Sequence, residues 1–321
     1  EWAKILECPY ISDLNQINNE HRMGELIRIS EALQEKRIAQ IADHIASHRN
    51  NIRLILIAGP SSSGKTSFAQ RLQIQLRVNG LHPIMISLDD YFLNREDTPR
   101  NEKGQYDYES IDAIDTALFN QNMLELLNGH KVQIPYYNFI SGRREWRDDN
   151  FLLLKEDQPI IIEGIHGLNE RLSADIARKS KYKIYISALT QLNIDAHNRI
   201  PTTEVRFLRR LVRDHQFRGA KAIKTIKQWP DVRAGEEKYI FPFQEEADVL
   251  FNSALIYEIG VLKKYAVPLL EAIGRGEEGY TEARLILRFL QYVDEIHDID
   301  DIPNNSIFRE FIGKSVFFKE Q

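Results

Sequence analysis

Short apolar runs alternate with amphipathic stretches along most of this chain. The apolar runs, each followed by polar or turn residues, are typical of buried parallel strands; they lie at residues 54–58, 83–88, 159–164, 182–186 and 247–251. Apolar residues recur at helical spacing between these runs, at residues 68–76, 111–127 and 203–215, and again after residue 258. This alternation predicts an α/β fold with a parallel sheet flanked by helices.

Residues 1–50 precede the first expected strand and are mostly polar, with apolar positions at helical spacing from Leu26 to Ile45. We interpret them as helices that pack on the core, because no catalytic group of residues occurs among them. The chain begins with Glu1 rather than Met. We therefore expect residues 1–50 to be the end of a truncated N-terminal region.

The amino-acid composition argues against several classes of protein. The chain has 321 residues, of which 43% are hydrophobic, and a formal net charge of −5. An acidic balance argues against bulk nucleic-acid binding but leaves open a local basic cleft. The single cysteine, Cys8, excludes an internal disulfide and a Cys/His metal cluster. No apolar run has the length of a membrane span and no signal peptide is present, so we expect a soluble cytoplasmic protein.

A glycine- and serine-rich loop follows the first expected strand and precedes a helical pattern. Its spacing is G-x-x-x-x-G-K-[ST], which predicts a phosphate-binding loop whose backbone N–H groups surround an anion. Lys65 would reach the β- and γ-phosphates, and the Thr66 hydroxyl would bind Mg²⁺. The alternative is a surface turn that matches by chance. The expected nucleotide-binding residues are Gly59, Pro60, Ser61, Ser62, Ser63, Gly64, Lys65, Thr66 and Ser67.

Two carboxylates end expected strands, at the sheet edge where open α/β sheets bind their ligands. Asp89 follows a strand that we expect to neighbour the phosphate-loop strand, which would suit a general base. Glu163 ends the most apolar strand, where an unpaired carboxylate is costly without Mg²⁺ or hydrogen bonds. The alternatives are that Asp89 or Asp90 caps the following turn, and that Glu163 caps the turn at Gly164.

The expected helix at 203–215 carries an arginine stripe. Arg206, Arg210 and Arg213 repeat at i, i+4 and i+7, with Arg209 at the edge of the same face. No carboxylate interleaves this stripe in the sequence, and like charges at this spacing repel. The stripe therefore suggests an anionic partner. Arg213 and Arg218 are placed to close over a transferring phosphoryl group; the alternative is a solvated basic face.

These motifs together resemble the uridine kinase family of P-loop nucleoside kinases, within the group that includes phosphoribulokinase. The resemblance covers residues from about 52 to 273. Ser87–Phe92 resembles the family segment S-x-D-x-[FY]-[FY], which implies that Asp89 is the general base. Val132–Phe139 is similar to V-Q-I-P-x-Y-D-F, which implies that Tyr137 contacts the nucleoside. Ile162–Ile165 matches F-E-G-I, which implies that Glu163 serves Mg²⁺.

The arginine stripe also resembles part of the family. The sequence from 209 to 214, followed by Arg218 and a glycine, is similar to the lid R-R-x-x-R-D…R-G. The resemblance implies that Arg210 reaches the ribose and that Arg213 and Arg218 reach the phosphates. Two positions depart from the pattern: Glu109 stands where the family has a ribose-binding Asp, and Gly142 stands where uridine–cytidine kinases have a base-contacting His.

The resemblance implies a P-loop kinase that uses Mg²⁺ and ATP to phosphorylate the 5′-hydroxyl of a ribonucleoside. It implies a kinase domain at 51–295, with a β excursion around 131–155 and an arginine lid around 206–245, and a C-terminal tail at 296–321. It is closest to bacterial nucleoside kinases with upstream domains like the N-terminal part of threonyl-tRNA synthetase.

Two alternatives stay open: a kinase of another small hydroxyl compound, and a nucleotide-dependent regulatory or RNA-associated module. The expected partners are a small-molecule nucleoside and ATP, with no membrane partner. The sequence does not decide between ATP and GTP, or between a monomer and a homo-oligomer.

Overall fold

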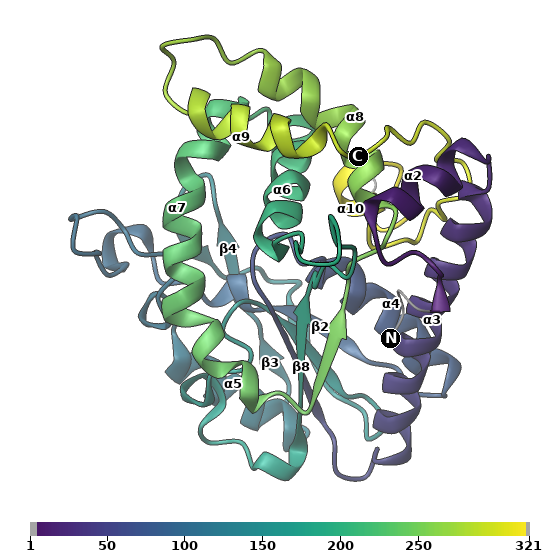
Figure 1. Ribbon diagram of the computed structural model, residues 1–321. Coiled ribbons are helices and arrows are strands. Elements are labelled where there is room, and N and C mark those ends of the chain that lie inside the picture. The colour runs from purple at the N-terminus through teal and green to yellow at the C-terminus, as the bar shows by residue number, and fades with distance from the viewer. Residues whose placement is uncertain (1–4, 319–321) are drawn as a thin grey trace.

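Five parallel strands form the central sheet of the computed structural model, which describes residues 5–318 (Figure 1). The strand order is β2–β7–β1–β8–β9. Each strand lies within a residue or two of an expected apolar run, which confirms the predicted fold class. The strands are β1 (Leu54–Ala58), β2 (Ile84–Ser87), β7 (Ile160–Glu163), β8 (Lys181–Ser187) and β9 (Val249–Asn252).

The strand order differs from the sequence-based expectation at one point. We expected β2, which precedes Asp89, to neighbour β1, but β7 pairs with both and lies between them. The three isoleucines of β7 are completely buried, whereas Ile84 and Met85 of β2 are half-buried. The more apolar strand takes the inner position because both of its faces are covered. All strands are parallel, so their carboxyl ends still share one edge.

Helices cover both faces of the sheet. Alternate residues of β1 pack in opposite directions: Ile55 and Ile57 contact the side that carries α3 and α4, and Leu54 and Leu56 contact the side that carries α5. A lid of α6 and α7 follows β8, and α8 and α9 follow β9. The helices are α2 (Ile11–Asn19), α3 (Met23–Ser47), α4 (Lys65–Val78), α5 (Thr116–Leu127), α6 (Thr202–Arg218), α7 (Ala222–Tyr239), α8 (Glu258–Glu271), α9 (Tyr280–Leu290) and α10 (Arg309–Ile312).

A small β-rich region stands beside the main sheet at the expected position. It consists of two antiparallel pairs, β3 with β6 and β4 with β5. These strands are β3 (Val132–Gln133), β4 (Tyr136–Asn138), β5 (Arg143–Glu145) and β6 (Phe151–Leu152). The N–H of Tyr137 donates to the Asp90 carboxylate at 3.2 Å, which fastens this region to the segment after β2.

The two ends of the described chain lie on the same side of the molecule (Figure 1). The side chain of Asn15 on α2 donates to the carbonyl of Tyr292 at 2.9 Å. The hydroxyls of Tyr257 and Ser306 both donate to the Glu31 carboxylate of α3. The C-terminal segment is therefore part of the packed core, together with the N-terminal helices.

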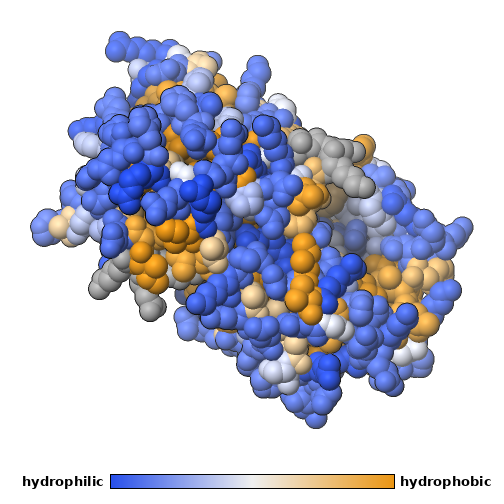
Figure 2. All heavy atoms as spheres, turned by 90° about the vertical axis from the view of Figure 1, so that its right-hand side faces the viewer, coloured by the Kyte–Doolittle hydropathy of each residue, from blue (hydrophilic) through white to orange (hydrophobic). Residues whose placement is uncertain are grey.

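The face that carries α3 is hydrophilic over most of its area, with apolar side chains in separate patches (Figure 2). Among residues 5–318, no helix combines the length and the apolar composition that a bilayer crossing requires.

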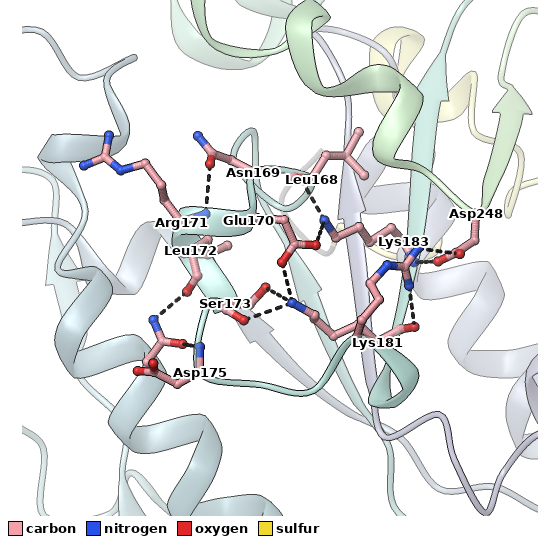
Figure 3. A network of polar contacts seen from close by, with 12 residues as sticks. Leu168, Asn169, Glu170, Arg171, Leu172, Ser173, Asp175, Lys181, Lys183 and Asp248 are labelled. Atoms are coloured by element: carbon pink, nitrogen blue, oxygen red, sulfur yellow. Dashed lines mark hydrogen bonds and ion pairs between the residues drawn. The ribbon is translucent and has the colours of Figure 1, made fainter.

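Two buried lysines on β8 tie the sheet to the segment after β7 (Figure 3). The Nζ of Lys183 donates to the carbonyl of Leu168 at 2.9 Å and to the Glu170 carboxylate. The Nζ of Lys181 donates to the other Glu170 oxygen at 2.6 Å and to the carbonyl of Ser173 at 3.0 Å. One carboxylate thus serves two ammonium groups. The network fixes the path of the chain shortly after β7, the strand that ends in Glu163, a candidate site residue.

Replacing Glu170 by Gln is expected to lower the free energy of unfolding by about 2–3 kcal/mol. A neutral amide cannot compensate the charges of Lys181 and Lys183, which stay buried. Urea denaturation monitored by circular dichroism measures this loss. Glu156→Gln, at an exposed position, is the control and should change stability by less than about 0.5 kcal/mol. Equal stability of the two variants would contradict the role given to Glu170.

Candidate active site

A cavity of about 530 Å³ opens at the carboxyl ends of the parallel strands. It is bounded by the phosphate loop, by the segments after β2 and β7, and by α6 and α7 of the lid. The cavity brings together residues that are far apart in the sequence. The predicted site residues that line it are Ser61, Ser62, Gly64, Lys65, Thr66, Asp89, Glu109, Glu163, Arg213 and Arg218.

The phosphate loop connects β1 to α4 in a conformation that requires glycine at two positions. Gly64 has φ +83°, in the left-handed region that favours glycine. A Cβ on Gly59 would lie 2.0 Å from the carbonyl oxygen of Ile186, so only glycine allows this approach to β8. Helix α4 begins at Lys65, and Lys65 and Thr66 of its first turn line the cavity. This geometry suits an anion, as the motif predicts.

Asp89 lies in a short 3₁₀ helix, Leu88–Tyr91, directly after β2. Its side chain is accessible to water from the cavity but is surrounded by protein atoms, and this burial raises its pKa. The charge of Lys65 opposes that rise and the charge of Asp90 adds to it. The Asp90 carboxylate instead accepts the N–H of Tyr137. Of the two neighbouring acids, Asp89 is therefore the one in the cavity.

Glu163 ends β7 between Asp89 and the phosphate loop. Burial raises the pKa of its carboxyl group to about 7. The positive charge of Lys65 lowers this pKa, and the negative charge of Asp89 raises it. The Thr66 hydroxyl donates to Oε2 of Glu163 at 3.4 Å. A hydroxyl and a carboxylate are oxygen ligands that suit Mg²⁺.

Protein groups alone do not complete a metal site here. Within the described part of the chain, no cluster of three or more His, Cys, Asp or Glu residues is arranged to hold a metal ion. A magnesium ion at Thr66 and Glu163 would therefore need further oxygen ligands from a bound phosphate and from water, as is usual for Mg²⁺.

The arginine stripe is partly neutralised by other helices, which corrects the expectation from the sequence. Arg206 pairs with Glu236 of α7, and the Nε of Arg209 donates to Glu258 of α8 at 2.7 Å. All four of these side chains are buried. Arg206 thus joins α6 to α7 and Arg209 joins α6 to α8, so both are engaged in ion pairs rather than facing an anionic partner.

Three further arginines of α6 share one carboxylate. Asp214 lies 3.3 Å from Arg210, 2.8 Å from Arg213 and 3.5 Å from Arg218. Three guanidinium groups around one carboxylate leave a surplus of positive charge. Arg213 and Arg218 line the same cavity as the phosphate loop. Arg210 also donates to Ser61 Oγ at 2.8 Å.

A second cavity of about 540 Å³ adjoins the first through Tyr108 and Glu109, which line both. Arg210 lines this second cavity. Burial raises the pKa of Glu109, and the charge of Arg210 lowers it. The structure therefore places Glu109 and Arg210, both predicted to bind the acceptor, on the side of the phosphate site where an acceptor could lie.

Tyr137 is not at either cavity, which corrects its predicted position. Its side chain is 2% exposed, and its ring packs on that of Phe92 with centroids 5.5 Å apart. Phe92, on which the Tyr137 ring packs, lines the first cavity, and Tyr137 does not. The aromatic residue that lines both cavities is Tyr108, next to Glu109. That residue was not singled out from the sequence, although its position beside a candidate carboxylate was a usable signal.

Two carboxylates from distant segments also reach the phosphate loop. Oε1 of Glu236 accepts the N–H of Ser61 at 3.0 Å. Oε2 of Glu310 accepts the hydroxyl of Ser67 at 2.7 Å and its N–H at 3.3 Å. Neither contact was predicted, because no local pattern marks an acid that meets the loop only after folding.

Comparison with known proteins places these motifs in a family. A sequence model described as "Phosphoribulokinase / Uridine kinase family" matches residues 54–258. Uridine kinase from Saccharomyces cerevisiae is 30% identical over 203 residues, which cover 62% of this chain and 36% of the yeast protein. Uridine kinase from Staphylococcus haemolyticus is 28% identical over 201 residues, which cover 62% of this chain and 87% of that protein.

Among solved structures, one titled "Structure of a Possible Uridine Kinase from Bacillus stearothermophilus" matches 68% of this chain and 98% of its own. The two are 20% identical, and the TM-score is 0.43. The present chain thus spans about a third of the yeast relative and most of the staphylococcal one.

Proposed function

We propose, because the chain belongs to the phosphoribulokinase and uridine kinase family, that it transfers a phosphoryl group from Mg·ATP to a hydroxyl group, with the 5′-hydroxyl of a ribonucleoside as acceptor. The observation that carries this proposal is a single cavity lined by the phosphate loop, the strand-end Asp89 and two arginines of α6. The curated relatives named uridine kinase support the nucleoside as acceptor.

On the phosphate side, cations meet the negative charge of the transferring group. Lys65 follows the turn of the loop, and the N-terminus of α4 presents backbone donors beside it. Arg213 and Arg218, from α6, line the same cavity. Positioned cations and amides of this kind stabilise the charge of a phosphoryl group in the transition state.

Thr66 and Glu163 would hold the magnesium ion, since their oxygen atoms lie within 3.4 Å of each other beside Lys65. When bound, Mg²⁺ would neutralise part of the negative charge of the phosphates. A carboxyl group with a pKa near 7 is favoured in its ionised form by an adjacent cation.

Asp89 is the proposed general base. Its carboxylate would accept the proton of the acceptor hydroxyl as that oxygen attacks the γ-phosphorus, while the bond between the γ-phosphorus and the bridging oxygen of ADP breaks. Burial raises the pKa of Asp89, which increases its affinity for that proton. Glu109 and Arg210 would hold the ribose in the adjoining cavity.

The structure at Gly142 keeps the identity of the acceptor open. A Cβ on this residue would lie 2.6 Å from the guanidinium of Arg95. Arg95 donates to the carbonyl of Phe139 at 3.1 Å and so fills the space where a larger side chain would stand. Where uridine–cytidine kinases have a His that contacts the base, this chain has Gly142, with the side chain of Arg95 packed next to it. This difference favours tests of acceptors other than pyrimidine nucleosides.

The function is tested by ADP release with Mg·ATP over a panel of ribonucleosides and non-nucleoside alcohols. We expect one ribonucleoside to stimulate ADP release and its 5′-deoxy analogue, which lacks the acceptor oxygen, to give none. Stimulation by a non-nucleoside alcohol alone would identify the alternative kinase. Tight ATP binding without stimulation by any acceptor, together with salt-dependent RNA binding, would indicate the regulatory or RNA-associated module instead.

A further inference from the structure

The C-terminal segment 302–318 lies against the phosphate loop, although it is outside the residues 54–258 matched by the family. Ile307, Phe308 and Phe311 of this segment are completely buried. A Cβ added to Gly64 of the loop would lie 2.3 Å from Cγ2 of Ile307. The segment therefore packs directly on the loop that is proposed to bind nucleotide.

One side chain of this segment occupies donors of the phosphate site. Oε2 of Glu310 accepts both the hydroxyl and the N–H of Ser67, at 2.7 and 3.3 Å. Ser67 belongs to the first turn of α4, whose N–H groups have no partner within the helix. These groups are the ones that bind a phosphate at a helix N-terminus. A carboxylate and a phosphate cannot both occupy the Ser67 donors.

The charge of Glu310 also matches this site. The residue lines the same cavity as Lys65, Arg213 and Arg218, so its carboxylate compensates part of their positive charge. Its influence reaches the Arg218 guanidinium, whose pKa is lowered mainly by burial and raised in part by Glu310. An incoming phosphate would be attracted by the same cations and repelled by Glu310.

The backbone around Glu310 is firmly held. The neighbouring Arg309 donates to the carbonyl of Ile302 at 2.7 Å. The ring of Phe311 packs 4.9 Å from the Arg209 guanidinium of α6. Ser306 donates to the buried Glu31 of α3. With these anchors in place, the side chain of Glu310 is the part of the segment that can leave the loop without disrupting the core.

We propose that Glu310 is a built-in competitor of nucleotide: it holds the Ser67 donors when no nucleotide is present, and phosphate binding requires its displacement. This inference rests on the proposed nucleotide site. Only molecules in which Glu310 has left Ser67 can bind phosphate. The apparent affinity for nucleotide is therefore the intrinsic affinity multiplied by the fraction of molecules in that state. It also gives the C-terminal segment, which the family match does not cover, a role in setting that affinity.

The experiment compares the unaltered chain with Glu310→Gln by titration calorimetry, using Mg·ADP and inorganic tripolyphosphate as probes. We expect the variant to bind both probes about tenfold more tightly, because the amide has no charge to compete with the phosphate. Glu271→Gln, at an exposed position at the end of α8, is the charge-matched control and should leave affinity unchanged.

The outcomes separate this inference from the proposed function. Unchanged or weaker binding by Glu310→Gln, with binding by the unaltered chain intact, would overturn the competitor role and leave the kinase assignment standing. A gain that also appears in Glu271→Gln would reduce the effect to net charge and overturn the role as well. If no chain bound either probe, both the competitor role and the nucleotide site would be wrong.

Discussion

Replacing Asp89 by Asn is expected to lower kcat about 10³-fold, within the range that a lost general base produces. The amide has nearly the same shape as the carboxylate but cannot accept the proton of the acceptor hydroxyl. Lys65 and the first turn of α4, which would bind the phosphates, are unchanged. We therefore expect the loss to appear in kcat, with little change in ATP affinity. Steady-state ADP release and calorimetric titration of ATP measure the two quantities.

Asp90→Asn is the control for this prediction. Asp90 is the next residue, but its carboxylate accepts the N–H of Tyr137, and the carbonyl oxygen of an asparagine can accept the same hydrogen bond. We expect this variant to keep kcat within about tenfold of the unaltered chain, well short of the loss of a general base. Equal losses in the two variants would indicate a general disturbance of the segment and would contradict the assignment of Asp89.

Replacing Glu258 by Gln is expected to lower the free energy of unfolding by about 3–5 kcal/mol. The variant leaves the guanidinium of Arg209, which is completely buried, without an opposite charge. The remaining contacts of Arg209 are with neutral oxygen atoms, among them the carbonyl of Ser253 at 2.9 Å. Such contacts do not offset the cost of an unpaired buried charge. Urea denaturation monitored by circular dichroism measures the loss.

The double variant Arg209→Met with Glu258→Met tests the reason for that loss. It removes both charges and keeps apolar volume, so we expect it to be more stable than Glu258→Gln. It should remain less stable than the unaltered chain, because the carbonyls of Ser62 and Ser253 lose a donor. If the double variant were the less stable of the two, an unpaired charge would not explain the effect.

The arginines of α6 fall into two groups along the helix. Arg206 and Arg209 of α6 are buried in ion pairs with Glu236 and Glu258. Arg213 and Arg218, further along the same helix, line the cavity. Arg206 and Arg209 hold α6 against α7 and α8, and this placement brings Arg213 and Arg218 to the cavity of the phosphate loop. Variants of Arg206 or Arg209 should therefore be less stable, and a loss of activity in them would follow from that loss of stability.

Local features of this protein were predictable from the sequence. The strands β1 and β7 were recognised because each is a continuous apolar run followed by a glycine or an acid. The loop from Gly59 to Thr66 was recognised because its glycines and its lysine are fixed by a backbone conformation within one short segment. Asp89 and Glu163 were placed at one edge because parallel strands present their carboxyl ends together.

Tyr137 shows the limit of such reasoning. A motif states which residue types occur, but Tyr137 is buried against Phe92, and Phe92 is the residue that lines the cavity. The order of β2, β7 and β1 was likewise set by competition among strands for the buried centre of the sheet. In both cases the outcome depended on which of several apolar groups packs closest, and no single segment contains that information.

The sequence by itself determined the α/β class, the phosphate loop, the acids at the strand ends and the arginines of the lid, because each follows from periodicity or spacing within a short segment. Only the tertiary structure decided which arginines face the cavity. Glu236 and Glu258 neutralise Arg206 and Arg209 from other helices, and Glu310 reaches Ser67 from 243 residues away. Charges at such separations meet only when the chain is folded, so their pairing is a property of packing.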